Sequence, residues 1–310
     1  MERERHGYLT SSLKLFFGLI VILVFIWSFN PETISLIQQQ ITKTNIFFVC
    51  LFIFLSTVPT LLRWIFLVTS NNLKVNTKSV IISYYSGFLL NSVSPANIGG
   101  DIYRAFAIQN SNNKYPTIIN ALLHERIYGL INLLILVALL SILFPSPNFY
   151  MSQENSQIIM GLLLLIICGF LFFKKALTIR LKKFKTFKFL SKYLNFDNTS
   201  YQYDFYVLLL SCLGFLCWAL AIFLVCQELN MHLTYMNILI ISAIVEIIRM
   251  VPLTFQGIGV REPSFAFIAS EFFGSNFEVA FFGGLIIYAC LSIINLTLGA
   301  IFYFQLNFKD

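Results

Sequence analysis

The residues best suited to chemistry are nine charged side chains inside or at the edges of apolar segments. They are Arg63, Asp101, Arg104, Glu125, Arg126, Glu246, Arg249, Arg261 and Glu262. A charge at the centre of a lipid bilayer costs about 2.5–3.5 kcal/mol on insertion scales, so most of these groups are expected to face an internal, partly hydrated cavity. Two that stand near segment edges, Arg63 and Arg126, are expected to extend toward the membrane surface. The surplus of one positive charge, carried by arginine, favours bidentate binding of phosphate.

Two pairs among these charges have the spacing of neighbours on one helix face. Asp101 and Arg104 are three residues apart, as are Glu246 and Arg249, and side chains at this spacing can form ion pairs. One interpretation is that such pairs are structural and hold their segments in place. The other is that they line a binding cavity. Both interpretations place the pairs in the protein interior.

Two segments that interrupt apolar runs share an internal spacing. One is NSVSPANIGGDIYRAF at 91–106 and the other is VPLTFQGIGVRE at 251–262. In each segment a glycine follows the proline by five residues, an arginine follows it by nine, and an acid stands near the arginine. Matching interruptions in two halves of a membrane protein point to a transporter site near the middle of the bilayer. The sequence therefore predicts an internal repeat.

The glycines in these segments allow sharp turns and a close approach of ligand to backbone. In each segment a helix is expected to start beside the glycines, near 98–101 and near 259–262. Free N–H groups and a partial positive charge at such a start favour an anion. For the acids at these starts, simple helix capping is the alternative interpretation. The candidate substrate-binding residues are Asn97, Gly99, Gly100, Asp101, Arg104, Glu125, Arg126, Glu246, Arg249, Gly257, Gly259, Arg261 and Glu262.

The composition is that of an integral membrane protein. Of the 310 residues, 58% are hydrophobic and 11% are charged, against roughly 25% charged residues in soluble proteins. The first apolar segment, 12–29, follows a basic start without a small-residue cleavage site, so we expect a retained span. The six cysteines lie in apolar runs and are expected to stay unpaired. The three histidines are far apart, and we expect no metal site, no cofactor and no nucleic-acid partner.

The distribution of basic residues constrains how the apolar segments cross the membrane. Eight segments are predicted, at 12–29, 45–69, 79–95, 118–143, 157–173, 204–227, 236–251 and 278–306. Loops rich in lysine and arginine stay in the cytoplasm, and all of them do so here only if 79–109 and 236–273 are re-entrant hairpins. The stretch from Ile81 to Pro95 is also short, because its fifteen residues span about 22 Å as a helix, less than the roughly 30 Å hydrocarbon core.

The expected fold is therefore an all-α polytopic membrane protein with about six full transmembrane helices and two re-entrant hairpins in an inverted repeat. The first half is 1–143 with hairpin 79–109, and the second is 157–310 with hairpin 236–273, within a single transmembrane domain. Both termini are predicted to lie in the cytoplasm, with the protein in the cell membrane. The basic run 174–192 is expected to be a cytoplasmic loop attracted to anionic lipid head groups.

Four motifs occur in a fixed order along nearly the whole chain. They are LRW at 62–64, FLLNSVSPANIGGDIYRAFAI at 88–108, ERIYGL at 125–130 and VPLTFQGIGVRE at 251–262. These motifs resemble those of the lysylphosphatidylglycerol synthase transmembrane region, or flippase-like domain, in a stand-alone form. The resemblance implies a polytopic membrane domain associated with lipid translocation. The chain ends at Asp310, and we expect neither a soluble aminoacyl-transferase domain nor lysyl transfer.

The leading functional hypothesis is a flippase-like transporter for a phosphate-bearing lipid, either a phospholipid or a polyprenyl-phosphate-linked lipid. Arg104, Arg261 and the hairpin helix starts are expected to hold the phosphate while the tails remain in lipid. Two alternatives stay open: a membrane transferase, and an accessory subunit that acts with a separately encoded lipid-modifying or glycosyl transferase. Against an enzyme, His124, Glu125 and Arg126 are consecutive and point to different helix faces, so they make no catalytic constellation.

Overall fold

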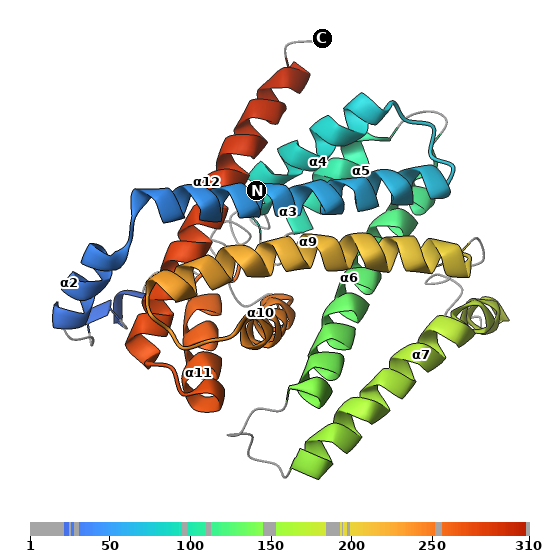
Figure 1. Cartoon of the computed structure of the whole chain (residues 1–310). Helices are drawn as coiled ribbons and strands as arrows, with labels where there is room; N and C mark the ends of the chain where they lie inside the picture. The colour runs from blue at the N-terminus through green and yellow to red at the C-terminus, as the bar shows by residue number, and fades with distance from the viewer. Residues whose placement is uncertain are drawn as a thin grey trace, which may run out of the picture.

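The computed structural model (Figure 1) is helical throughout the secondary structure that it describes. It describes residues 22–24, 26–27, 31–92, 94, 98–109, 113–144, 153–183, 193, 195–196, 199–251 and 256–307. The helices are α2 (Pro31–Gln40), α3 (Lys43–Ser70), α4 (Thr77–Ser92), α5 (Ile98–Ala107), α6 (Tyr115–Leu143), α7 (Gln153–Lys183), α9 (Tyr201–Glu228), α10 (Tyr235–Arg249), α11 (Arg261–Phe273) and α12 (Phe277–Asn307). The α3 and α9 helices pack side by side along much of their length.

Local sequence signals set where several helices begin and end. The hydroxyl oxygens of Thr42, Ser200 and Thr234 each accept a hydrogen bond from the backbone N–H three residues on, at 3.2, 3.1 and 3.3 Å. These are N-caps of α3, α9 and α10, and they satisfy a helix-start donor that would otherwise lack a partner. At a helix C-terminus, Gly274 takes a left-handed φ of +71° and ends α11.

Five helices are long and apolar enough to cross a membrane: α3, α6, α7, α9 and α12. They match the predicted full spans 45–69, 118–143, 157–173, 204–227 and 278–306. Large apolar side chains, such as Leu165 and Phe173 on α7, point outward. Outward-facing apolar side chains are expected where helices contact lipid rather than water. The chain is therefore a multi-pass membrane protein. The predicted first span, 12–29, lies almost entirely outside the described residues.

The basic run that was predicted to be a loop from residue 174 begins instead as helix. The α7 helix continues to Lys183, and Lys174 is buried, with 3% of its surface exposed. Its ammonium pairs with Asp204 at the start of α9 and donates to the Tyr128 hydroxyl at 2.7 Å. The loop prediction was wrong for Lys174, because the counter-charge of Asp204 on a neighbouring helix offsets much of the cost of burying the ammonium. Residues 184–192 lie outside the described part.

Contacts between connecting segments define two ends of the helix bundle. At one end, the Asn113 side chain accepts a hydrogen bond from the Lys74 N–H at 2.9 Å and donates to the Lys74 carbonyl at 3.3 Å. At the other end, the Thr42 N–H donates to the Glu228 carboxylate at 2.7 Å, which joins the start of α3 to the end of α9. The segments before α4 and after α5 therefore lie at the same end.

Besides α2, which has 10 residues, four described helices are too short to cross a bilayer alone. The α4, α5, α10 and α11 helices have 16, 10, 15 and 13 residues, so the longest spans about 24 Å. The α4 helix packs on α5 and on α12, whereas α10 packs on α11 and on α6. The first helix of each short pair thus also contacts a long helix that is distant in sequence.

Two apolar cores hold these elements. One is centred on α9, α10, α11 and α12, and the other lies between α3, α4 and α6. Trp64 and Tyr128 are fully buried in the second core, and Phe265 and Phe281 in the first. All six cysteines are free, as predicted. The polar site lies between the two cores.

Candidate functional site

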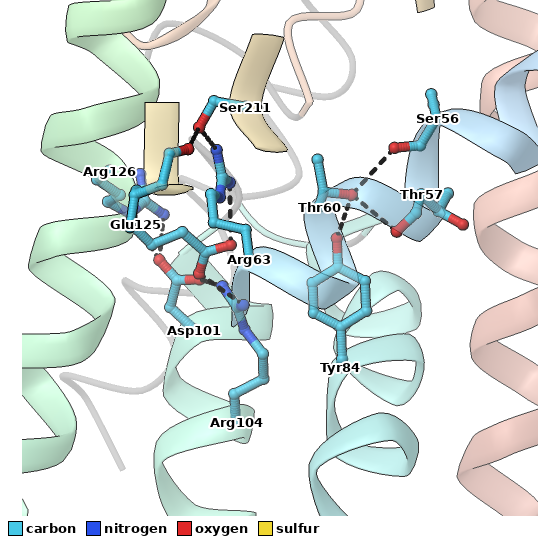
Figure 2. Close-up of polar contacts among 11 residues, drawn as sticks. Ser56, Thr57, Thr60, Arg63, Tyr84, Asp101, Arg104, Glu125, Arg126 and Ser211 are labelled. Carbon is cyan, nitrogen blue, oxygen red and sulfur yellow. Dashed lines mark hydrogen bonds and ion pairs between the residues drawn. The ribbon is translucent and has the colours of Figure 1, made fainter. Parts of the chain in front are cut away.

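Three arginines and two acids form a continuous ion-pair network where α3, α5 and α6 meet (Figure 2). Arg104 pairs with Asp101 and, at 2.8 Å, with one carboxylate oxygen of Glu125. The other Glu125 oxygen accepts from Arg63 at 3.1 Å, and the other Asp101 oxygen pairs with Arg126 at 2.6 Å. Every carboxylate oxygen of the network is therefore occupied by a guanidinium. The predicted pairing of Asp101 with Arg104 is confirmed.

Arg63 faces the interior rather than the membrane surface. Its guanidinium also donates to the Ser211 hydroxyl on α9 at 2.8 Å (Figure 2), and its side chain is 13% exposed. The prediction that Arg63 extends to the surface was wrong, because Glu125 offers it a buried counter-charge on the neighbouring helix. Arg126 is different: its side chain is 42% exposed.

Arg104 is committed to contacts within the protein. Besides its two carboxylate partners, its guanidinium lies over the ring of Trp64 at 4.6 Å and near that of Tyr84 at 5.5 Å from the centroids. These are cation–π contacts, which add to the ion pairs when the group is desolvated. Only 8% of the residue is exposed. Arg104 therefore joins α5 to α3, α4 and α6 and has little free binding capacity.

The first pair of glycines lets α5 pack tightly against α4. A Cβ on Gly100 would lie 2.5 Å from the Gly87 carbonyl oxygen and 2.5 Å from the Asn91 side chain, closer than atoms approach without a shift. The Gly100 N–H donates to that Asn91 oxygen at 2.7 Å, and the Gly99 N–H donates to the Ser94 hydroxyl at 2.9 Å. Two N–H donors that were expected to be open to an anion are thus occupied by the protein.

The second glycine segment is a tight turn between α10 and α11. Gly257 and Gly259 have φ of +81° and +77°, a region that residues with a Cβ rarely adopt. A Cβ on Gly257 would also lie 2.9 Å from the Cγ atoms of both Arg249 and Arg261. Just before the turn, the Gln256 amide donates to the Ser92 hydroxyl at the end of α4, at 3.1 Å. The second interrupted segment therefore touches the first.

Glu262 closes the start of α11. Its carboxylate accepts a hydrogen bond from the Gly259 N–H at 2.8 Å, and the residue is 2% exposed. This is the capping arrangement that sequence analysis gave as an alternative for the acids. The helix start at Gly259 is therefore occupied, like that at Gly99 and Gly100, rather than open to an anion.

Arg261 is buried without an ion pair to any residue that the structure describes, although Glu262 is its neighbour in sequence. The residue is 1% exposed, and its Nε, Nη1 and Nη2 atoms have no hydrogen-bond partner among the described residues. One face of the guanidinium lies over the Tyr288 ring, at 4.2 Å from the centroid. A buried charge of this kind is costly unless it is paired. The five N–H donors of the guanidinium therefore have no acceptor among the described residues.

Two adjoining cavities collect most of these side chains. The larger has a volume of about 320 Å³ and is bordered by Arg63, Glu246, Arg249 and Arg261 together with neutral polar and aromatic residues. The smaller, of about 270 Å³, is bordered by Arg63, Asp101, Arg104, Glu125, Arg126 and Arg249. Arg63 and Arg249 line both. Arg249 pairs with Glu246 at 2.5 Å, as the sequence predicted.

Most of the predicted site residues converge on these cavities, but in different roles. Seven of them line a cavity: Asp101, Arg104, Glu125, Arg126, Glu246, Arg249 and Arg261. Gly99, Gly100, Gly257 and Gly259 shape the turns, and Glu262 caps α11. Asn97 lies outside the described residues, as do Pro95 and Pro252.

Sequence reasoning missed the neutral polar residues of the larger cavity. They are Ser56, Thr57, Thr60, Asn91, Asn132, Ser211, Gln256 and Asn295. Ser56 and Thr60 are four residues apart on α3, so the signal that could have found them is polar residues at helical spacing within a long apolar segment. Isolated asparagines within α6 and α12 are a second signal of the same kind.

Comparison with known proteins identifies a family across nearly the full length. No curated protein matches the chain. The sequence model of the lysylphosphatidylglycerol synthase TM region matches residues 13–299, which include both glycine segments, all seven cavity-lining charges named above, four of the five long apolar helices and most of α12. The chain belongs to the family of the lysylphosphatidylglycerol synthase transmembrane region.

Proposed function

We propose that this protein moves phosphate-bearing lipids across the cell membrane, with the phosphate held by Arg261 in the larger cavity and the lipid tails left in the bilayer. The observation that carries the proposal is the burial of Arg261 with three guanidinium nitrogens unpartnered, on the wall of a cavity of about 320 Å³. The family to which the chain belongs is named for a lipid-modifying synthase, which supports a lipid as the ligand.

An anion is the ligand that this environment favours. Arg261 stacks one face on Tyr288, and its edge presents the planar fork of N–H donors that binds phosphate through two parallel hydrogen bonds. Arg249 and Arg63 border the same cavity and add to the positive potential. The phosphate seat proposed here is Arg261 alone, because Arg104 and the glycine N–H groups already have partners.

The short helices support a placement of this seat near the middle of the bilayer. The α4–α5 and α10–α11 pairs have the length and packing that re-entrant hairpins require, and the segments flanking the first pair meet at one end of the bundle. The reciprocal contacts of α4 with α12 and of α10 with α6 support an inverted repeat. In transporters built this way, access alternates as the two halves move around a fixed central site.

The distribution of lysines supports an orientation. Lys74 and Lys114 flank the end at which α3 finishes and α6 begins, whereas segments 229–234 and 274–276 at the far end have no lysine or arginine. Because basic segments remain on the cytoplasmic side, we place the first end in the cytoplasm, together with both termini.

A transport assay tests the proposal. Purified protein is reconstituted into liposomes with acyl-labelled phosphatidylglycerol, and lipid movement is followed by chemical quenching of the label in the outer leaflet. We expect movement by the native protein and at least a tenfold lower rate for Arg261→Ala, since one buried charged hydrogen-bond pair to the phosphate is lost. Lys78→Ala, which removes an exposed cation at the start of α4, is the matched control. Equal rates for native protein and Arg261→Ala would overturn the proposal.

A further inference from the structure

Another cavity lies at the end of the bundle where α3 finishes and α6 begins. Its volume is about 150 Å³, and it is bordered by Ser70, Asn71, Pro116, Thr117, Asn120, His124, Asn195, Thr199 and Tyr203. None of these residues borders the two central cavities. All but Pro116 have polar side chains, and a cavity that is both polar and this large holds water.

Side-chain amides join three elements around this cavity. The Asn120 amide on α6 donates to the side-chain oxygen of Asn71, just after α3, at 3.1 Å. The Asn120 oxygen accepts from the N–H of Asn195, in the segment that precedes α9, at 2.8 Å. The cavity therefore lies where the first half of the chain meets the second.

His124 is the side chain of this lining whose charge changes near neutral pH. The residue is 1% exposed, and its Nδ1 shares a hydrogen bond with the Tyr203 hydroxyl on α9 at 2.9 Å. The imidazole stacks on the ring of Phe196, with centroids 4.6 Å apart. Its Nε2 is buried and makes no side-chain hydrogen bond with a described residue. His124 thus joins α6 to α9 and keeps one nitrogen unsatisfied.

The titratable groups that face His124 contain one carboxylate. Lys174 on α7 forms an ion pair with Asp204 on α9, and the Tyr128 hydroxyl on α6 contacts both. The Tyr128 ring lies edge-on to the imidazole, with centroids 6.1 Å apart. Lys174, Asp204 and the backbone of Asn195 act on the imidazole electrostatically. An imidazolium here would share the Asp204 carboxylate with the Lys174 ammonium.

We propose that this cavity is a proton-binding site, at which His124 takes up a proton from water on the side where α6 begins. Uptake leaves two buried cations for one carboxylate, which is costly while the ring stays dry. A ligand shifts a protein toward the conformation that binds it more tightly, so acidification favours a conformation in which α6 and the segment before α9 separate and water reaches the ring. The inference goes beyond the proposed function and does not depend on which lipid is moved.

The accessibility of the cavity tests this inference with all histidines in place. Thr117→Cys, in the cavity lining, and Lys114→Cys, exposed just before α6, are made separately in a background whose six native cysteines are replaced by serine. Their rates of reaction with a membrane-impermeant maleimide are expressed as a ratio, which removes the common dependence of thiol reactivity on pH. We expect the ratio of the Thr117 rate to the Lys114 rate to rise about fivefold from about pH 7.5 to about pH 5. An unchanged ratio would overturn the inference.

Replacing the histidine identifies the group that binds the proton. His124→Gln keeps a side chain that can hydrogen-bond to Tyr203 but takes up no proton, so its labelling ratio should be equal at the two pH values. His232→Gln is the matched control, because His232 is exposed between α9 and α10, and it should respond like the native protein. A pH response that persists in His124→Gln would show that another group binds the proton, which overturns the inference.

Nitrogen NMR of the protein with labelled histidine gives a second measurement on the native chain. The chain has three histidines, and the signal that His124→Gln lacks belongs to His124. Its ring nitrogens should shift between the two pH values, and constant shifts would overturn the inference. Neither measurement uses lipid transport. If no lipid moves in the liposome assay, the proposed function fails while these results still decide the proton site; if the labelling ratio is unchanged, this inference fails while the proposed function stands.

Discussion

Arg104 and Arg261 stand at the same position of the two repeated segments, nine residues after a proline, but they have opposite surroundings. Arg104 contacts two carboxylates and two aromatic rings. Arg261 contacts one ring and has no ion-pair partner in the described part of the chain. The same residue therefore serves the structure in one half and is open to a ligand in the other, which the shared spacing alone does not distinguish.

This difference predicts opposite effects on stability. Arg104→Met should lower the free energy of unfolding by about 3–5 kcal/mol, because Asp101 and Glu125 lose a buried partner. Arg261→Met should leave it unchanged or raise it, because an uncompensated buried charge is removed. Thermal unfolding of the purified variants in detergent measures both. A similar loss of stability in the two variants would show that Arg261 has a partner in the protein.

The network around Glu125 allows a second prediction. Glu125→Gln should destabilise the protein by about 3 kcal/mol, because Arg63 and Arg104 both lose the charge that compensates their burial. Combining Glu125→Gln with Arg104→Met should recover part of that loss, since fewer unpaired charges remain. Additive losses in the double variant, measured by the same unfolding experiment, would show that the contacts drawn in Figure 2 are not coupled energetically.

The chemistry of single residues was predictable where partners are close in sequence. The pairs Asp101–Arg104 and Glu246–Arg249 follow from three-residue spacing on one helix. Partners that come from distant helices were not predictable: Lys174 with Asp204, and Arg63 with Glu125. The occupied N–H groups of the glycines also depend on such tertiary contacts, because Asn91 belongs to the neighbouring helix.

Among the helices, α4 and α5 depend most on the absence of side chains at their contact. Gly100→Ala would bring a Cβ to 2.5 Å from the Gly87 carbonyl oxygen. We expect a loss of about 1–3 kcal/mol in stability, the usual effect of overpacking. Gly161→Ala on α7 is the matched control, because its Cβ would meet nothing within 4 Å, and alanine is the better helix former. Equal unfolding temperatures for the two variants would show that the α4–α5 contact is looser than described.

The extents of the helices were largely predictable from apolar length and capping residues. The predicted segment 236–251 corresponds to α10, whose start is fixed by Thr234. The end of α7 was not predictable, because the basic residues after 173 resemble a solvated loop until a counter-charge on α9 is known. The packing of α4 against α12, between segments about 200 residues apart, leaves no local signal at all.

Taken together, the helices place the segments before α4 and after α5 at one end, and these segments carry Lys74 and Lys114. This arrangement predicts that cysteines introduced at Asn76 and Lys114, both exposed, react with a membrane-impermeant thiol reagent from the cytoplasmic side. A cysteine at the exposed Asn276 should react only from the outer side. The experiment uses a background in which the six native cysteines are replaced by serine. Labelling of positions 76 and 114 from opposite sides would show that α4 and α5 together cross the bilayer.

The Gln256 amide donates a hydrogen bond to the Ser92 hydroxyl, which joins the segment before α11 to the end of α4. It is a neutral hydrogen bond, with a net strength of about 1 kcal/mol, less than twice the thermal energy at room temperature. The ion pairs that hold α5 to α6 are several times harder to break. The contact between the two interrupted segments is thus weaker than the ion pairs between α5 and α6, and we expect it to break before they do.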